Sequence, residues 1–101
     1  MLFRSIRGIV GAERLETIKT TFWVTWAEFI AGLGVGVLDR KRLATDTHDM
    51  VSHAGNIGYR RLADVCREVS HCARHEEEAE LRRLIERMRE VAEATRIEDR
   101  R

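Results

Sequence analysis

The stretch Thr47–Gly58, THDMVSHAGNIG, decides the fold of this chain because it joins a core-facing stripe to a titratable imidazole on one helix. Spacings of four and three residues, typical of the buried face of a helix, link Leu43, Thr47, Met50, Ala54 and Ile57. His48 lies one position past that stripe, so we expect its ring to be packed at the base and open at the tip. Short side chains share its side of the helix: Ala44, Val51, Ser52 and Gly55. A folded partner could therefore approach the ring closely.

The composition favours a single all-helical domain that covers residues 1–101. Pro is absent, charged residues make up 35% of the chain, and the 44% apolar content is dominated by Ala, Leu, Val and Ile. A chain of 101 residues can bury a modest core but cannot form a deep enzymatic cleft.

Helical periodicity continues on both sides of the opening stretch. We expect helices over Leu2 to Val10, Ala12 to about Val37, Asp39 to about Asn56, Tyr59 to Ala73, and from about Glu76 onward. The connections between the last four are short, and short connections place successive helices antiparallel. The predicted fold is an antiparallel up-down four-helix bundle with a short additional N-terminal helix.

The segment from Ala12 to Val37 is the most apolar part of the chain. Residues 20–38 have about the length of a membrane span of 20 residues, but Glu28 lies near the centre, where a carboxylate costs roughly 2.5–3.5 kcal/mol to insert. A buried bundle helix explains the pattern better, so we expect no membrane contact. The string GLGVG, Gly32–Gly36, lacks the preceding strand of a phosphate-binding loop, and we expect it to loosen or end the helix.

Net charge and cysteine usage restrict the partners and the compartment. The formal net charge is +1 and no basic stripe is interleaved with aromatic residues, so we expect no nucleic-acid partner. Cys66 and Cys72 lie six residues apart on one predicted helix and point away from each other, which prevents an internal disulfide. Free thiols predict a reducing, cytoplasmic setting. His71 and His75 have a metal-ligand spacing without a third ligand nearby, so we interpret them, like His53, as surface residues.

The sequence HDMVSHAGNIG resembles the phosphoacceptor motif of histidine phosphotransfer (HPt) domains, which is His-x-Leu-Lys-Gly followed by small residues, an apolar residue and Gly. His48 matches the phosphorylated histidine, Met50 the apolar residue two positions later, and Ile57–Gly58 the closing pair. The continuation YRRLADVCREVSHCAR is similar to the next helix of that family. The resemblance runs from Asp39 to near Thr95 without a gap.

This resemblance implies a phosphoryl carrier rather than an enzyme. His48 would accept a phosphoryl group from a receiver-domain aspartate and pass it to another receiver. The implied partners are response-regulator receiver domains and a hybrid histidine kinase, and the Mg²⁺ would come from the receiver, so no intrinsic cofactor or metal is expected. A neutral imidazole is nucleophilic near neutral pH, and in-line transfer requires mainly positioning and charge neutralisation from the carrier. We expect a monomer in preference to an oligomer.

The residues around His48 depart from the family motif at two positions. The family Lys falls on Val51 and the family Gly on Ser52. Valine cannot supply the positive charge of lysine, and Arg74 in the following helix is the candidate substitute. Arg60 and Arg61 are alternatives for that charge. The predicted supporting shell therefore comprises Val51, Ser52, Gly55, Ser70 and Arg74, with Ser70 falling where HPt-like domains orient the ring.

Two other interpretations fit the same residues. A binding-only, degenerate HPt-like module would dock a receiver or a histidine kinase without carrying phosphate. A helical oligomerisation module would have no signalling role. Labelling of His48 by a phosphorylated receiver separates the first interpretation from the phosphoryl carrier, and binding of any receiver separates the second.

Overall fold

The computed structural model describes residues 11–33 and 36–100, which form helices without any strand. The helices are α2 (Ala12–Leu33), α3 (Arg40–Ile57), α4 (Arg60–Cys72) and α5 (Glu78–Asp99). The all-helical prediction is therefore confirmed for this part of the chain. The helix expected over Leu2–Val10 lies outside the described residues. Among the four helices that are described, none combines the length and the apolar character needed to cross a membrane.

Local backbone preferences and side-chain caps explain where α2 ends and where α3 begins and ends. The helix α2 stops at Leu33, four residues before the predicted end, and Gly36 then adopts a left-handed φ of 77° that a right-handed helix cannot contain. The Asp39 side chain caps α3 by accepting a hydrogen bond from the Arg42 backbone N–H at 3.1 Å. At the other end, Gly58 has a φ of 103° and donates its N–H to the last turn of α3.

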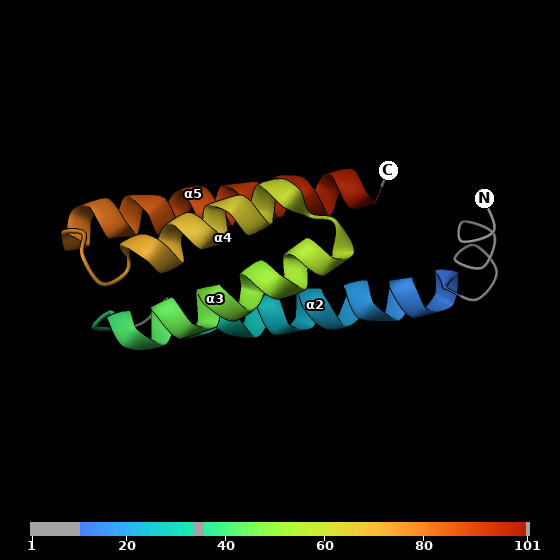
Figure 1. The fold of residues 1–101 in the computed structure, drawn as a ribbon, viewed down its shortest axis with the longest axis horizontal. Coiled ribbons are helices and arrows are strands. Elements are labelled where there is room, and N and C mark those ends of the chain that lie inside the picture. The colour runs from blue at the N-terminus through green and yellow to red at the C-terminus, as the bar shows by residue number, and fades with distance from the viewer. Residues whose placement is uncertain (1–10, 34–35, 101) are drawn as a thin grey trace.

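The helices form an elongated body with principal extents of 49 × 21 × 21 Å. Figure 1 shows α2 along α3 and α5 along α4, with the α3–α4 pair joining the two halves. The α3–α4 contact is the most extensive of the helix pairs that are described. This pair therefore determines where the side chains of α3, including His48, lie relative to α4.

The core is built from the predicted stripes. All members of the α3 stripe are buried except Ile57, which is partly buried and packs against the core. On α4 and α5 the fully buried positions include Leu62, Cys66, Leu81 and Met88. Thr47 is the single buried polar residue of the described ranges, and its hydroxyl donates to the Leu43 carbonyl at 2.7 Å. No buried side-chain nitrogen or oxygen is left without a hydrogen-bond partner in those ranges.

An aromatic cluster joins α2 to the start of α4. Phe22, Trp26 and Phe29 are buried, as their helical spacing predicts, and Trp26 packs edge-on against Phe29 with ring centroids 5.4 Å apart. Tyr59, which precedes α4, packs edge-on against Phe22 at 5.6 Å. Trp23 is half-buried and lies 5.5 Å from the Tyr59 ring, so it belongs to this cluster rather than to a free surface.

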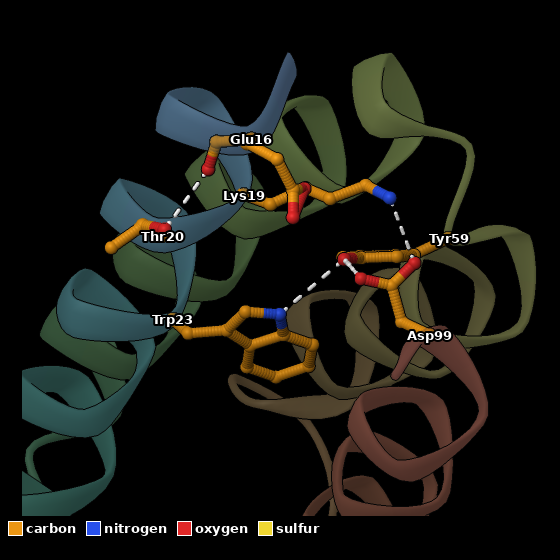
Figure 2. Close-up of polar contacts among 6 residues, drawn as sticks. All are labelled: Glu16, Lys19, Thr20, Trp23, Tyr59 and Asp99. Atoms are coloured by element: carbon orange, nitrogen blue, oxygen red, sulfur yellow. Dashed lines mark hydrogen bonds and ion pairs between the residues drawn. The ribbon is translucent and has the colours of Figure 1, made fainter. Parts of the chain in front are cut away.

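The Tyr59 hydroxyl is the polar centre of this cluster (Figure 2). It donates to Asp99 Oδ2 at 2.8 Å and accepts from Trp23 Nε1 at 3.3 Å. Lys19 Nζ donates to the other Asp99 oxygen at 2.9 Å. Burial of the Asp99 carboxylate would raise its pKa, but the hydrogen bonds from Lys19 and Tyr59, together with the Lys19 charge, lower the pKa below its ordinary value. Four side chains thus connect α2, the start of α4 and the end of α5.

We predict that Tyr59→Phe lowers the free energy of unfolding by about 1–2 kcal/mol, because the Trp23 N–H loses its acceptor and Asp99 loses a donor. Urea denaturation followed by circular dichroism measures the change. Thr20→Ala is the control, since it removes an exposed hydroxyl that bonds only within α2, and should change stability by at most about 0.5 kcal/mol. Equal stability of Tyr59→Phe and the wild type would contradict the prediction.

Stability should also fall at alkaline pH. Burial raises the pKa of the Cys66 thiol from 9.0 to about 12, and burial followed by the Asp99 hydrogen bond raises the pKa of Tyr59 from 10.0 to about 12. Both groups hold their protons more tightly in the folded state, so their contribution is complete below pH 9 and is lost as the pH rises toward 12. Cys66→Ala should start less stable because of the cavity, yet lose less stability between about pH 8 and about pH 10.5. An unchanged loss over that interval in urea denaturation would contradict the assignment to Cys66.

Candidate functional site

His48 is exposed on α3 although the residue before it and the residue two positions after it are buried. Thr47 is fully buried and Met50 is 4% exposed, whereas the imidazole of His48 is open to solvent. The core stripe therefore fixes the rotation of α3 about its axis, and this rotation presents His48 outward. The expected position of His48, at the edge of the stripe with an accessible ring, matches this geometry.

An open groove of about 450 Å³ lies beside His48, between α3 and α4. One wall comes from α3 and the other from the last turn of α4 and the loop that follows it. The lining residues are Ala44, Thr45, His48, Ser70, His71, Arg74 and His75. Three of the residues predicted for the site, His48, Ser70 and Arg74, are thus brought together at this groove.

Ser70 joins the two walls of the groove. Its hydroxyl donates to the backbone carbonyl of Ala44 at 3.1 Å. Ala44 lies four residues before His48, so this carbonyl is the one that accepts the His48 backbone N–H within α3. Ser70 therefore fixes the turn of α3 that carries His48, and its hydroxyl proton is directed to the backbone rather than to the imidazole.

Arg40 fixes the loop that carries Arg74 and His75. Its guanidinium, from the first turn of α3, donates to the backbone carbonyls of Ala73 at 3.1 Å and Glu76 at 2.5 Å. The carbonyls at the end of α4 are the groups that a helix leaves without internal partners. Arg40 satisfies one of them and at the same time ties the loop to α3, which keeps Arg74 next to the groove.

Arg74 is the cation that the structure places beside His48. Its side chain is exposed and forms no ion pair within the described ranges, so the guanidinium is available to a ligand. The two alternatives, Arg60 and Arg61, line a different groove with Tyr59 and Asp99 at the opposite end of α4. Ten residues of α4, about 15 Å along its axis, separate Arg60 from Ser70, which lies at the His48 groove. Arg60 and Arg61 are therefore too far away to act at His48.

The other three predicted shell residues lie further along α3. Val51 is half-buried and packs against the core, while Ser52 and Gly55 are exposed on the same side of the helix as His48. A Cβ added at Gly55 would meet no atom within 4 Å. These three residues form the open surface next to the groove and are absent from its lining.

The remaining histidines and the cysteines occupy distinct places. His53 is exposed and lines an apolar groove between α2 and α3, together with Ile18, Phe22 and Ile57. The rings of His71 and His75 are 6.5 Å apart. Within residues 11–33 and 36–100, no group of three metal-ligating side chains is found.

The sequence interpretation missed two features of this region. His71 and His75 are exposed, as expected, but they also line the His48 groove, and their spacing from Arg74 on one helical face is the signal that could have revealed it. The second feature is the place of Tyr59, whose partners are distant in the sequence. It is 9% exposed and bound to Asp99, because its ring completes the aromatic cluster.

The two thiols are free, and their surroundings suppress their reactivity. Cys66 is completely buried and Cys72 is partly buried. Burial, followed by the charges of Glu76, Glu68 and Glu80, raises the pKa of the Cys72 thiol. Neither cysteine therefore has the lowered pKa of a catalytic nucleophile.

Comparisons of this chain with protein-family models, curated proteins and solved structures found no match.

We predict that Gly55→Ala stabilises the protein by roughly 0.5–1 kcal/mol, because Gly55 lies inside α3 and the added methyl group meets open space. Gly58→Ala is the matched control. Its φ of 103° is unfavourable for alanine, so this variant should be destabilised. Urea denaturation of both variants gives the two signs. A loss of stability in Gly55→Ala would mean that α3 is packed or distorted at this position.

Proposed function

We propose that this protein is a histidine-containing phosphotransfer protein that shuttles a phosphoryl group between receiver-domain aspartates through His48. The proposal includes the antiparallel up-down bundle with an additional N-terminal helix and a cytoplasmic setting. The observation that carries it is the combination of an exposed imidazole, small neighbours on its face of α3, and a free guanidinium across the adjacent groove.

The chemistry requires little from the carrier beyond this arrangement. The imidazole nitrogen attacks phosphorus in line, the N–P bond forms, and the P–O bond to the aspartyl carboxylate breaks. The carboxylate leaves within the receiver, whose own acidic pocket holds the Mg²⁺. The return step is the reverse reaction with a second receiver, so no nucleotide, oxidant or resident metal is needed.

Arg74 supplies the positive charge that Val51 cannot. The phosphoryl group on His48 carries negative charge into a groove whose rim includes Arg74, His71 and His75. A guanidinium binds phosphate oxygens with directed N–H groups, which suits this role. Ser70 and Arg40 contribute indirectly, because they hold the two walls of the groove at a fixed separation.

Gly55 and Ser52 provide the approach for a receiver. A docking domain must bring its aspartyl phosphate to the imidazole in line, and large side chains on this face would prevent that. On the side of His48 toward the end of α3, the exposed surface carries a hydroxymethyl group at Ser52 and a hydrogen atom at Gly55. The half-buried Val51 adds an apolar contact next to them.

Incubation with a phosphorylated receiver should transfer an acid-labile, base-stable label to the wild-type chain and none to His48→Gln. His53→Gln is the matched control, because His53 is an exposed histidine on the same helix but lines a different groove. It should be labelled like the wild type. Labelling of His48→Gln would show that the phosphorylated site is elsewhere.

The same experiment distinguishes the binding-only alternative. Substitution of valine for the family lysine at position 51 is the feature that favours this alternative. A receiver that binds the chain without ever labelling it would support a docking module in place of a carrier. Failure of every receiver to bind would overturn both.

A further inference from the structure

The exposed face of α2 is nearly free of charge beyond its first turns. Exposed positions recur along it at spacings of four and three residues, and most are uncharged: Arg14, Thr17, Thr21, Val24, Glu28 and Ala31. Between Thr20 and Gly36 the only charged residue is Glu28, in a chain with 35% charged residues. The exposed faces of α4 and α5, in contrast, carry arginine, aspartate and glutamate along their length, and that of α3 carries charged residues up to Asp49.

Two large apolar side chains are exposed on this face. Ile18 is 50% exposed and Val24 is 55% exposed. Thr17, Ile18, Thr21 and Thr25 also line the apolar groove between α2 and α3, so this face extends to the edge of α3. Burial of such side chains is favourable by about 25 cal/mol per Å² of apolar surface. A continuous face of this kind is typical of a protein interface.

We propose that this face binds the same face of a second copy of the chain, with the two α2 helices antiparallel about a two-fold axis at Thr21. In that register, a residue a given number of positions before Thr21 in one copy lies opposite the residue the same number of positions after Thr21 in the second copy. The matched pairs are Ile18 with Val24, Thr17 with Thr25, and Arg14 with Glu28 of the second copy.

Charge complementarity selects this orientation. An antiparallel pair places each Arg14 beside the Glu28 of the other copy, giving two ion pairs at the ends of the contact. A parallel, in-register pair would place Arg14 against Arg14 and Glu28 against Glu28, which is repulsive. In the antiparallel register Ile18 meets Val24 of the second copy, so both large apolar side chains are covered.

The spacing of the face also fits a helix pair. Alternating steps of three and four residues produce a seam along which two helices pack at a crossing angle of about 20°. From Arg14 to Glu28 the contact is about 21 Å long. It is therefore at the small end of stable interfaces, which bury about 1,200–2,000 Å² in total. We expect a dimer that dissociates on dilution into the low micromolar range.

This interface leaves the His48 groove open. The groove is lined only by residues of α3, α4 and the loop after α4. The dimer therefore does not depend on the proposed phosphotransfer function. The proposed dimer departs from the monomer that we expected from the sequence, because the exposure of this face becomes visible only when α2 is placed against α3.

Sedimentation equilibrium of the full chain tests the proposal. The mass should rise from 11.7 kDa toward twice that value as the concentration increases over about 1 to about 500 μM. Val24→Lys should weaken association at least tenfold, since it buries a charge within the contact, one helical turn from its centre. Ala94→Lys, which adds the same charge at an exposed position of α5, should not change the mass. A wild-type chain that stays monomeric over this range would overturn the proposal.

Charge reversal tests the register. Arg14→Glu and Glu28→Arg should each weaken the dimer by about 3- to 30-fold through the loss of two ion pairs per dimer. The double variant should recover most of the wild-type affinity. Weakening without recovery would overturn the antiparallel register.

An alternative to the second copy is that the apolar side chains of residues 2–10 of the same chain cover this face. Phe3→Glu combined with Ile6→Glu removes that option within the full chain. A wild-type monomer that dimerises only with this double substitution would show that the chain covers the face itself. Dimerisation that is the same in both chains would support the second copy as the occupant.

Discussion

The arrangement of the bundle depends on one phenol hydroxyl at which three helices meet. Tyr59 stands at the start of α4, donates to Asp99 near the end of α5, and accepts from Trp23 in α2. Lys19 completes the set by binding the other oxygen of Asp99. Without these contacts α2 would be held mainly by its packing on α3. This packing is less extensive than the α3–α4 and α4–α5 contacts. A half-buried polar group of this kind specifies one arrangement of the helices, because any other arrangement leaves several polar groups without partners.

The position of His48 follows from constraints at both ends of the α3–α4 pair. Near one end, Gly58 reverses the chain in a left-handed conformation and Tyr59 enters the aromatic cluster. Near the other end, Arg40 binds the carbonyls that follow α4. Between them Ser70 bonds directly to the turn of α3 that precedes His48. The imidazole itself forms no hydrogen bond in the described ranges, whereas the helix that presents it is fixed by Ser70 and Arg40. A free ring on a fixed helix is what the proposed docking partner would need.

Patterns that act within one helix were predictable from the sequence. The buried stripe of α3, the Asp39 cap and the end of α3 near Gly58 all follow from local spacing and backbone preference. Most contacts between helices were not, although the family resemblance led us to expect Ser70 and Arg74 near His48, and both line its groove. The Tyr59–Asp99 bond joins residues 40 apart in the sequence, and no local pattern links them. The same limit explains why the grouping of His71 and His75 with His48 was missed, since it depends on the distance between α3 and α4.

The surface of the domain is divided between two chemically different faces, and this division has a mechanical consequence. The His48 groove has a cationic and polar rim suited to an anion, whereas the outer face of α2 is nearly free of charge and suited to another apolar surface. Because the two faces share no residue, the proposed partner at the groove and the proposed second copy at α2 would not compete for the same side chains. The two faces are nevertheless mechanically linked, since α2 packs on the α3 that carries His48. A second copy bound at the α2 face would therefore be linked to His48 only through the packing of α2 on α3.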